Sequence, residues 1–142
     1  MIRVEPAAGA GLDPCLAIRR RVFVEEQGVA LADEQDGRDS ACAHWLASLD
    51  GECVGTARLR KVAGAWKAER VAVLAKARGH GVGAALMRAL EAEAWRRGAT
   101  HLLLHAQTSV VPFYERLGYR AEGPVFDEAG IPHRKMSKAR PC

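Results

Sequence analysis

The alternation of apolar and polar residues at the start of the chain predicts a strand, a helix and a loop. Residues 2–5 have the pattern of a strand. Asp13 and Pro14 predict the start of a helix over about 14–27, because Asp caps helices and Pro suits their first position. The acidic, glycine-containing stretch 28–40 is predicted to be a loop.

Three strand-like runs follow in close succession. They cover about 41–49, 52–62 and 66–74, and the pair Asp50-Gly51 separates the first two. An Asp-Gly pair between two strand-like runs is a strong signal for a tight hairpin. The three runs therefore predict an antiparallel meander.

A long amphipathic helix is predicted next. It begins near Gly81, and its apolar face is formed by Val82, Ala85, Leu86, Ala89 and Leu90. Basic residues followed by Gly98 give a helix stop signal. The strand predicted over 101–107 follows this helix, so it can pair in parallel with the strand before the helix through a right-handed crossover.

The last part of the chain predicts one short helix and two strands. Ser109 can cap a helix over 110–117, and a strand over 119–124 follows it. A loop over 125–132 then leads to a last strand near 133–138. The order of elements predicts an α/β (α+β) fold with a mixed, mostly antiparallel central sheet flanked by helices.

Composition indicates a single globular domain over residues 1–142. Hydrophobic residues make up 49% of the chain and charged residues 27%. A chain of this length buries enough surface to fold without a metal ion or a disulfide. The net charge of +4 suits an anionic ligand, but no run of Lys and Arg exceeds residues 19–21. Nucleic-acid binding, which needs a basic stripe, is therefore disfavoured.

The N-terminus and the cysteines indicate a cytoplasmic protein. The first residues lack the basic-then-apolar pattern of a signal peptide, and no stretch is long and apolar enough to span a bilayer. Cys15, Cys42, Cys53 and Cys142 are widely spaced. We therefore expect free thiols rather than disulfides or metal ligands, and no metal site.

The segment 71–86 carries the strongest chemical signal. It has the pattern of a strand, a basic glycine-rich turn and the start of a helix. Gly79, Gly81 and Gly83 let a ligand approach the backbone, and the first N–H groups of a helix attract an anion. Arg78 adds a cation whose planar fork matches phosphate oxygens. The segment predicts a site for a phosphate-bearing ligand, and a mere tight turn is the alternative.

Two common phosphate sites fit this segment poorly. Residues 79–84 satisfy the G-x-G-x-x-G/A pattern of dinucleotide-binding proteins. The following strand, however, ends near Gln107 without the carboxylate that holds a ribose, and the strands upstream are predicted to be antiparallel. A P-loop is excluded because no Gly-Lys-Ser/Thr follows at the required spacing.

Coenzyme A is the third possibility. Arg78-x-x-Gly81-x-Gly83 matches the R/Q-x-x-G-x-G/A signature of the GNAT N-acetyltransferase superfamily, which also lies between a strand and a long helix. The sequence Pro-Phe-Tyr-Glu-Arg-Leu-Gly-Tyr over 112–119 resembles the second hallmark of that family. The order of predicted elements also resembles the family over nearly the whole chain.

Further segments resemble the ElaA-like branch of this superfamily. They are residues 21–27, Asp36 with His44, residues 105–107 and residues 126–133. The resemblance implies acetyl-CoA as the cofactor and direct transfer of its acetyl group to a primary amine. The amine belongs to a small molecule or a peptide, and the resemblance does not name it.

The resemblance also implies where the cofactor binds. In GNAT proteins two central parallel strands splay apart and the cofactor lies in the gap. Carried over to this chain, the backbone of Val71, Ala72 and Val73 contacts the pantetheine and the thioester. The turn that would hold the pyrophosphate consists of Arg78, Gly79, His80, Gly81, Val82, Gly83 and Ala84, and Ser109 and Phe113 are further candidate contacts.

For the reaction, the resemblance implies that Tyr114 protonates the leaving thiolate and that the Val73 N–H stabilises the developing oxyanion. The alternative for Tyr114 is an amphipathic side chain that covers the sheet. The acceptor amine must also lose a proton. Glu69 and His105 are the main candidate bases, with His44 and Glu25 beside them, and solvent is an alternative.

The acceptor site is expected between the first helix, the loop 28–40 and the loop before His133. Its candidate residues are Glu25, Asp36, His44 and His133. The acidic residues of this region favour a cationic amine, although a solvated acidic loop explains them equally well.

Other classes of function stay open at this point. A non-catalytic acyl-CoA-binding or regulatory module has the same fold as an acetyltransferase. A nucleic-acid-binding protein would show strongly salt-dependent affinity. We expect neither a nucleic acid nor a membrane as partner, and a homodimer stays open because GNAT proteins often dimerise.

Overall fold

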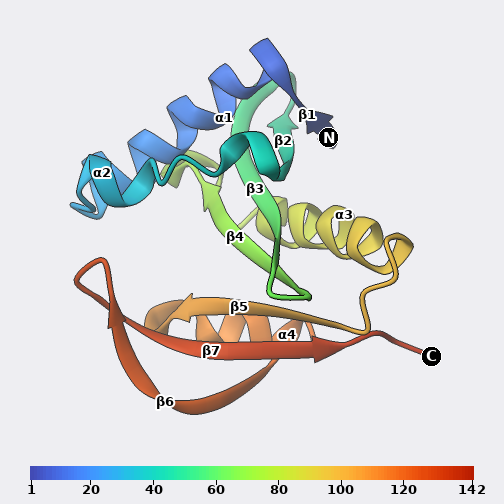
Figure 1. The fold of residues 1–142 in the computed structure, drawn as a ribbon. Helices are drawn as coiled ribbons and strands as arrows, with labels where there is room; N and C mark the ends of the chain where they lie inside the picture. Colours follow the sequence, from blue (N-terminus) through green and yellow to red (C-terminus); the bar gives the residue numbers. More distant parts are fainter.

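The computed structural model describes all residues 1–142, and Figure 1 shows the arrangement of its elements. The strands and helices are β1 Ile2–Ala7, α1 Leu12–Arg19, α2 Leu31–Glu34, β2 Ala43–Leu49, β3 Glu52–Val62, β4 Ala65–Val73, α3 Val82–Arg96, β5 His101–Gln107, α4 Val111–Arg116, β6 Arg120–Glu128 and β7 Ile131–Ala139. None of the helices has the length and apolar character that crossing a membrane requires.

All seven strands form one sheet of order β1-β2-β3-β4-β5-β7-β6. The pairs β1–β2, β2–β3, β3–β4, β5–β7 and β7–β6 are antiparallel. Only β4 and β5 run parallel, with α3 as the crossover between them. The predicted meander, the parallel crossover and the mixed, mostly antiparallel α/β fold class are all confirmed.

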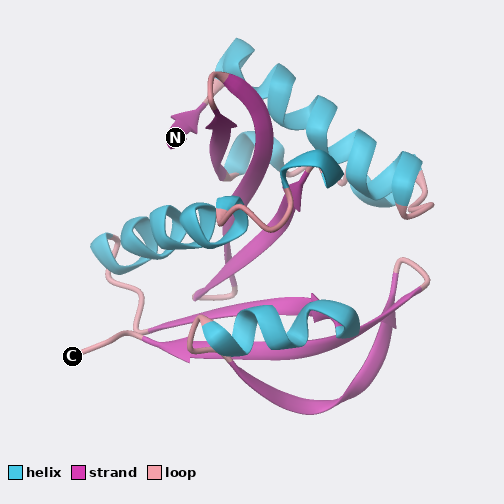
Figure 2. Cartoon of the chain, turned by 180° about the vertical axis from the view of Figure 1, so that it is seen from behind, coloured by secondary structure: helices cyan, strands magenta, loops and turns pink.

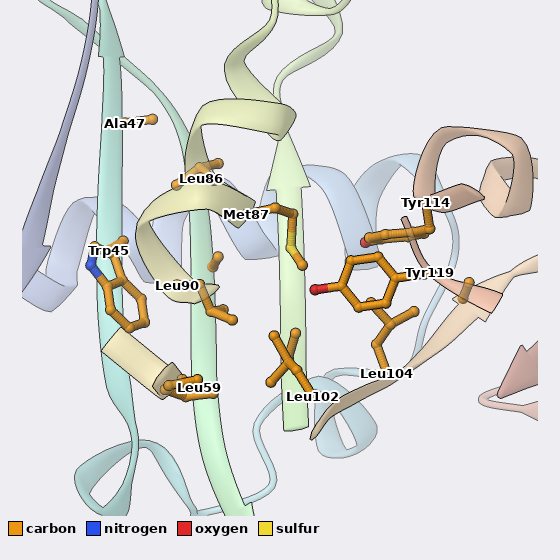
Figure 3. Packing of buried hydrophobic residues seen from close by; sticks show 14 of the residues in the cluster. Trp45, Ala47, Leu59, Leu86, Met87, Leu90, Leu102, Leu104, Tyr114 and Tyr119 are labelled. Carbon is orange, nitrogen blue, oxygen red and sulfur yellow. The ribbon is translucent and has the colours of Figure 1, made fainter. Parts of the chain in front are cut away.

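Helices cover both faces of the sheet. Figures 1 and 2, which view the molecule from opposite sides, show α1 on one face and α3 and α4 on the other. The main core lies under α3, where Leu86, Met87 and Leu90 are fully buried and belong to one cluster with Leu59 and Leu102 of the sheet (Figure 3). This core fixes the start of α3 relative to β4, which positions the glycine-rich turn between them.

The first helix differs from the prediction in two ways. α1 begins at Leu12 with Gly11 as its N-cap, so Asp13 lies inside the first turn and no side chain caps the helix. A turn of 3-10 helix over Gly9–Gly11 leads directly into α1, where a polar N-cap residue was expected. Beyond α1 the helix continues as π-helical turns over Arg20–Glu26.

Two predicted loops contain more regular structure than expected. The stretch 28–40 includes α2 and the start of a short 3-10 helix. The predicted loop over 125–132 is mostly a β-hairpin, because β6 runs on to Glu128. Ala129 and Gly130 form its two-residue turn with φ of +52° and +77°. An Ala-Gly pair predicts such a turn weakly because alanine rarely adopts positive φ.

The strands β4 and β5 separate after a short paired segment. Parallel pairing joins residues Trp66–Ala68 to Leu102–Leu104 and goes no further. Just beyond it a β-bulge adds an extra residue to β4, where Arg70 takes a φ of +54°. Because bulges bend a strand and increase its twist, the rest of β4 turns away from β5. Figure 1 shows the two strands starting side by side and diverging.

Candidate active site

A cavity of about 1030 Å³ lies between the diverging strands. Its walls come from β4 and the turn after it, from β5 and α4, from the first helix, and from the turn between β6 and β7. The volume matches the upper end of the range for small-molecule and cofactor pockets. The gap therefore has room for an extended ligand.

The turn between β4 and α3 presents a row of backbone donors to this cavity. Gly79 and Gly81 have φ of +82° and +86°, a conformation that favours glycine. None of the N–H groups of residues 79–84 donates a hydrogen bond to another backbone group. The N-terminus of α3 adds partial positive charge at the same place. The row therefore fits an anion such as a pyrophosphate.

Gly83 brings α4 close to this row. A Cβ on Gly83 would approach the ring of Phe113 to 3.1 Å, which is tighter than an ordinary contact. A larger residue there would force Phe113 to move, so glycine keeps this aromatic wall against the start of α3.

The edge of β4 that faces the gap also has available backbone groups. The Leu74 N–H donates to the Val54 carbonyl of β3 at 2.8 Å. Backbone groups alternate along a strand, so the N–H and C=O of Val73 point the other way, into the gap. No strand pairs with β4 on that side at Val73. The Val73 carbonyl already accepts from Arg78 Nε, so the Val73 N–H is the group left to bind a carbonyl of an extended ligand.

Arg78 reaches from the turn to the first helix. Its Nη1 and Nη2 donate to the two carboxylate oxygens of Glu26 at 2.7 and 2.8 Å. These hydrogen bonds lower the pKa of Glu26. The Nε of Arg78 donates to the Val73 carbonyl at 3.0 Å. Arg78 is thus oriented toward the cavity, and Glu26 is the anion that it binds in this structure.

The structure brings the predicted cofactor-binding residues together with one exception. Those that line the cavity are Val71, Ala72, Val73, Arg78, Gly79, Gly81, Val82, Gly83, Ala84, Ser109 and Phe113. His80 is exposed and does not line it, so only its backbone belongs to the site. Ser109 does not cap α4, because the N-cap is Val110 and no side chain bonds to this helix end.

Tyr114 lines the cavity from α4 and is 8% exposed. Phe113 and Tyr119 pack edge-on against its ring, with centroids 4.9 and 5.8 Å away. In Figure 3 the rings of Tyr114 and Tyr119 extend toward Met87. Burial raises the pKa of Tyr114, so its hydroxyl keeps its proton at neutral pH. Tyr119 instead donates to Glu91 at 2.6 Å.

A histidine and a carboxylate form a pair on the β5 side of the cavity. His105 Nδ1 lies 2.8 Å from Glu128 Oε1. Since a carboxylate only accepts, Nδ1 carries a proton, and in the neutral ring the lone pair is then on Nε2. Phe126 packs edge-on against the His105 ring at 5.0 Å, and His133 Nε2 lies 3.8 Å from the other oxygen of Glu128. The ring is therefore held with Nε2 able to accept a proton.

Three cations surround Glu69. Arg58 donates to it at 2.7 Å and Arg60 at 2.8 Å, and Lys67 Nζ forms an ion pair with it at 3.1 Å. Burial alone would raise the pKa of Glu69, but the hydrogen bonds from Arg60 and Arg58 outweigh it and hold the pKa at about 2. A carboxylate with so low a pKa is a weak base at neutral pH. The geometry therefore favours His105 over Glu69 as the base.

Two predicted acceptor-site residues lie outside the cavity. Glu25 is exposed and does not line it, because the π-helical turns shift the helix register and bring Glu26 there instead. His44 is 4% exposed and lies beneath the loop, where its Nε2 donates to the Asp39 carbonyl at 2.8 Å. Glu25 and His44 therefore lie outside this cavity, whereas His133 lines it.

Asp36 lines the cavity, but its charge is already balanced. Its carboxylate accepts from Arg58 at 2.7 and 3.1 Å, and Arg70 lies 3.4 Å away. The Arg58 hydrogen bonds lower the pKa of Asp36. The acidic character of the loop therefore does not make this end of the cavity a site for a cation.

Several residues at or near the site were not predicted from the sequence. Glu128 belongs to a stretch expected to be a loop, and Arg58 lies in the middle of β3. Gln107 Nε2 donates to Gln27 Oε1 at 2.7 Å and links β5 to the first helix. A charged residue within an apolar strand is the signal that identifies Arg58, because such residues need buried partners.

Comparisons with known proteins agree with this geometry. The family model described as "Acetyltransferase (GNAT) domain" matches residues 18–140. The chain is 43% identical over 123 residues to the uncharacterized N-acetyltransferase YjcF of Bacillus subtilis, covering 85% of this chain and 87% of that protein.

Solved structures show the same likeness. The crystal structure of ElaA from Escherichia coli superimposes with a TM-score of 0.84 at 30% identity, covering 97% of this chain and 99% of that one. An aminoglycoside 6′-N-acetyltransferase crystallised with coenzyme A has a TM-score of 0.76 at 20% identity, covering 99% of each chain. The second likeness concerns the fold alone.

Proposed function

The chain belongs to the GNAT acetyltransferase family, and on that premise we propose which of its residues carry out the reaction. It is an acetyl-CoA-dependent N-acetyltransferase, an acyltransferase that acts on an amine. The resemblance to the ElaA-like branch noted in the sequence is confirmed.

The row of unpaired N–H groups at residues 79–84 is the observation that carries the proposal. This row binds the pyrophosphate of coenzyme A at the start of α3. Arg78 exchanges Glu26 for a phosphate oxygen, since both are anions that match its fork. The unpaired edge of β4 at Val71–Val73 binds the amides of the pantetheine arm, as a neighbouring strand would.

Bound acetyl-CoA supplies an acetyl group on a thioester. The Val73 N–H donates to the carbonyl oxygen of that group and stabilises the charge that develops on it. Tyr114 holds a proton on its buried hydroxyl and donates it to the departing sulfur. His105 accepts a proton at Nε2 from the acceptor amine, while Glu128 keeps the ring in the required tautomer. Asp36 and His133 belong to the acceptor end of the cavity.

The central test measures binding and transfer separately. Isothermal titration of coenzyme A reports binding, and thiol release from acetyl-CoA with a panel of primary amines reports transfer. We expect both signals. A protein that binds coenzyme A but releases no thiol with any amine would be a non-catalytic module and would contradict the proposal.

Replacement of Tyr114 by Phe tests the proton donor. Tyr114→Phe removes the only proton that this side chain can give, so we expect kcat to fall about 100-fold with coenzyme A affinity unchanged. Tyr119→Phe is the matched control, because that hydroxyl binds Glu91 and takes no part in the reaction. An undiminished kcat in Tyr114→Phe removes Tyr114 from the mechanism.

The proposal also covers the domain organisation, the cellular location and the partners of the enzyme. One domain covers residues 1–142, which the match over 18–140 supports. All four cysteines are free thiols, which supports a location in the reducing cytoplasm. A homodimer and a small-molecule or peptide acceptor are expectations from the family, and sedimentation tests the first of them.

A further inference from the structure

Four charged side chains lie on one face of the hairpin β3–β4, at the acceptor end of the cavity. The register pairs Arg58 with Glu69 and Arg60 with Lys67. Directly paired residues share a face of the sheet, and so do residues two apart on one strand. Arg60, Lys67 and Glu69 line the cavity, and the fully buried Arg58 lies behind them.

Three carboxylates of this region are already bound by cations. Glu69 accepts from Arg58 and Arg60 and forms an ion pair with Lys67, and Asp36 accepts from Arg58 and Arg70. Glu34, 3% exposed, accepts from Arg70 at 2.8 Å and also binds Arg19. None of these three carboxylates is left to receive the ammonium group of a substrate.

The cations outnumber the carboxylates in this buried network. Its cations are Arg19, Arg58, Arg60, Lys67 and Arg70, and its carboxylates are Glu34, Asp36, Asp39 and Glu69. The network therefore carries a net charge of +1, although each of its cations contacts a carboxylate. At the rim, Arg38 and Asp33 also line the cavity, but both are exposed and their opposite charges cancel.

This net positive charge lies at Arg60 and Lys67, whose N–H groups are not all hydrogen-bonded. Arg60 uses Nε and Nη2 for Glu69, and its Nη1 has no partner. Lys67 Nζ forms an ion pair with Glu69 Oε2 at 3.1 Å, and it has three N–H groups to donate. Both side chains are poorly solvated, with exposed fractions of 16% and 13%. A charge that water reaches so little gains from a bound counter-anion.

Resting on the acetyl transfer proposed above, we propose that the acceptor amine carries an anionic group, a carboxylate or a phosphate, which binds between Arg60 and Lys67. The position suits the reaction. Lys67 pairs with Leu103 where the strands still touch, and His105 lies two residues further along the same face of β5. Two residues advance a strand by about 6.6 Å, so the amine and the anionic group are separated by a short linker of a few bonds.

The test compares matched amines that differ only in charge. The probes are γ-aminobutyrate against γ-aminobutyramide, and phosphoethanolamine against ethanolamine, with thiol release from acetyl-CoA as the readout. We expect kcat/KM to be at least about tenfold higher for the anionic member of one pair or of both. The pair with the larger ratio identifies the carboxylate or the phosphate. Equal rates, or faster transfer to the neutral members, would overturn the inference.

Variants show whether the preference arises at this site. Arg60→Gln and Lys67→Gln should each raise KM for the anionic amine about tenfold and change kcat/KM for the neutral amine less than about twofold. Lys61→Gln is the control, because Lys61 lies on the same hairpin but stacks over Trp66 outside the cavity. If Lys61→Gln lowers the preference as much, the effect is one of overall charge and the inference is wrong.

The two proposals fail in different ways. If amines are acetylated without any preference for an anionic group, only the present inference fails. If no amine of either kind is acetylated while calorimetry shows bound coenzyme A, the proposed reaction fails and the inference fails with it.

Discussion

Glu26 and Arg78 form a bidentate ion pair between the first helix and the turn that is proposed to bind phosphate. Their side chains are 41% and 44% exposed. An ion pair with so much solvent around it contributes little to stability, on the order of 1 kcal/mol or less. A phosphate group can therefore replace Glu26 at Arg78 without a large change elsewhere in the structure.

Glu26→Gln tests this competition. The neutral side chain no longer competes for Arg78, so we expect the Kd of coenzyme A to fall about two- to fivefold in a calorimetric titration. Glu25→Gln is a matched control, because Glu25 is exposed and outside the cavity, and it should leave the Kd unchanged. A higher Kd in Glu26→Gln would mean that Glu26 positions Arg78 rather than competing for it.

The sequence predicts single residues well where the backbone does the binding and poorly where side chains bind one another. The turn 79–84 was predicted from its glycines, Arg78 and the helix that follows, and in the structure its N–H groups make no backbone hydrogen bonds. The partners of Glu69 come from β3 and β4 through a register that no local pattern reveals. For the same reason Glu25 looks equivalent to Glu26 in the sequence, although only Glu26 lines the cavity.

The helix α3 packs closely against β3 at Gly55. A Cβ on Gly55 would lie 2.9 Å from Val82 Cγ1 and 3.0 Å from Leu86 Cδ1. Both neighbours are buried residues of α3, and Val82 is its first residue. The absence of a side chain at Gly55 therefore sets how closely the phosphate-binding end of α3 approaches the sheet.

Gly55→Ala is expected to push the start of α3 outward. Overpacking of a core typically costs about 1–3 kcal/mol, so the free energy of unfolding should fall by that amount in chemical denaturation. The Kd of coenzyme A should rise as well, because the row of N–H groups moves with α3. Gly11→Ala, at a site with nothing within 4 Å, should change both quantities much less. An unchanged Kd with lowered stability would separate the packing of α3 from the site.

Element types were predictable because periodicity and turn chemistry are local. The meander and the crossover follow from runs of apolar residues and from Asp50-Gly51, and the structure confirms them. The hairpin at Ala129-Gly130 was not predictable, since its turn uses an alanine at positive φ. The bulge at Arg70 was also not predictable, because it depends on how β4 pairs with β3.

At the scale of the whole molecule, a buried ionic network joins α1, α2, β3 and β4. Arg19 and Arg58 are 1% and 0% exposed, and they hold carboxylates from the chain segment between the first helix and β2. Removing one partner of a buried ion pair typically costs several kcal/mol. The network therefore ties the acceptor loop to the sheet.

Because of this network, the free energy of unfolding depends on pH. The pKa of Asp36 is below its ordinary value, and that of Glu69 is about 2 instead of 4.5. The unfolded chain binds these protons more tightly than the folded one, so unfolding takes up protons and the free energy of unfolding falls as pH falls. The stabilisation is fully present above about pH 5 and is lost between about pH 4.5 and 2. Glu69 accounts for roughly 3 kcal/mol of it.

Denaturant unfolding at a series of pH values from 7 to 3 measures this dependence. Glu69→Gln should be less stable than the wild type at pH 7 and should lose less stability on acidification. Glu5→Gln, which removes an exposed carboxylate of β1, serves as the control. A pH profile in Glu69→Gln as steep as that of the wild type would show that other carboxylates govern the acid response.

The divergence of β4 and β5 places an unpaired strand edge in the middle of a sheet, whereas most proteins confine such edges to the border. A bare edge is a template on which other chains can add strands. The two halves of the sheet enclose the unpaired edge of β4, so the gap admits an extended ligand with regularly spaced amides. In the proposed complex, coenzyme A would occupy the place of a missing strand. The resistance of the protein to β-mediated aggregation is therefore expected to follow the cellular supply of its own cofactor.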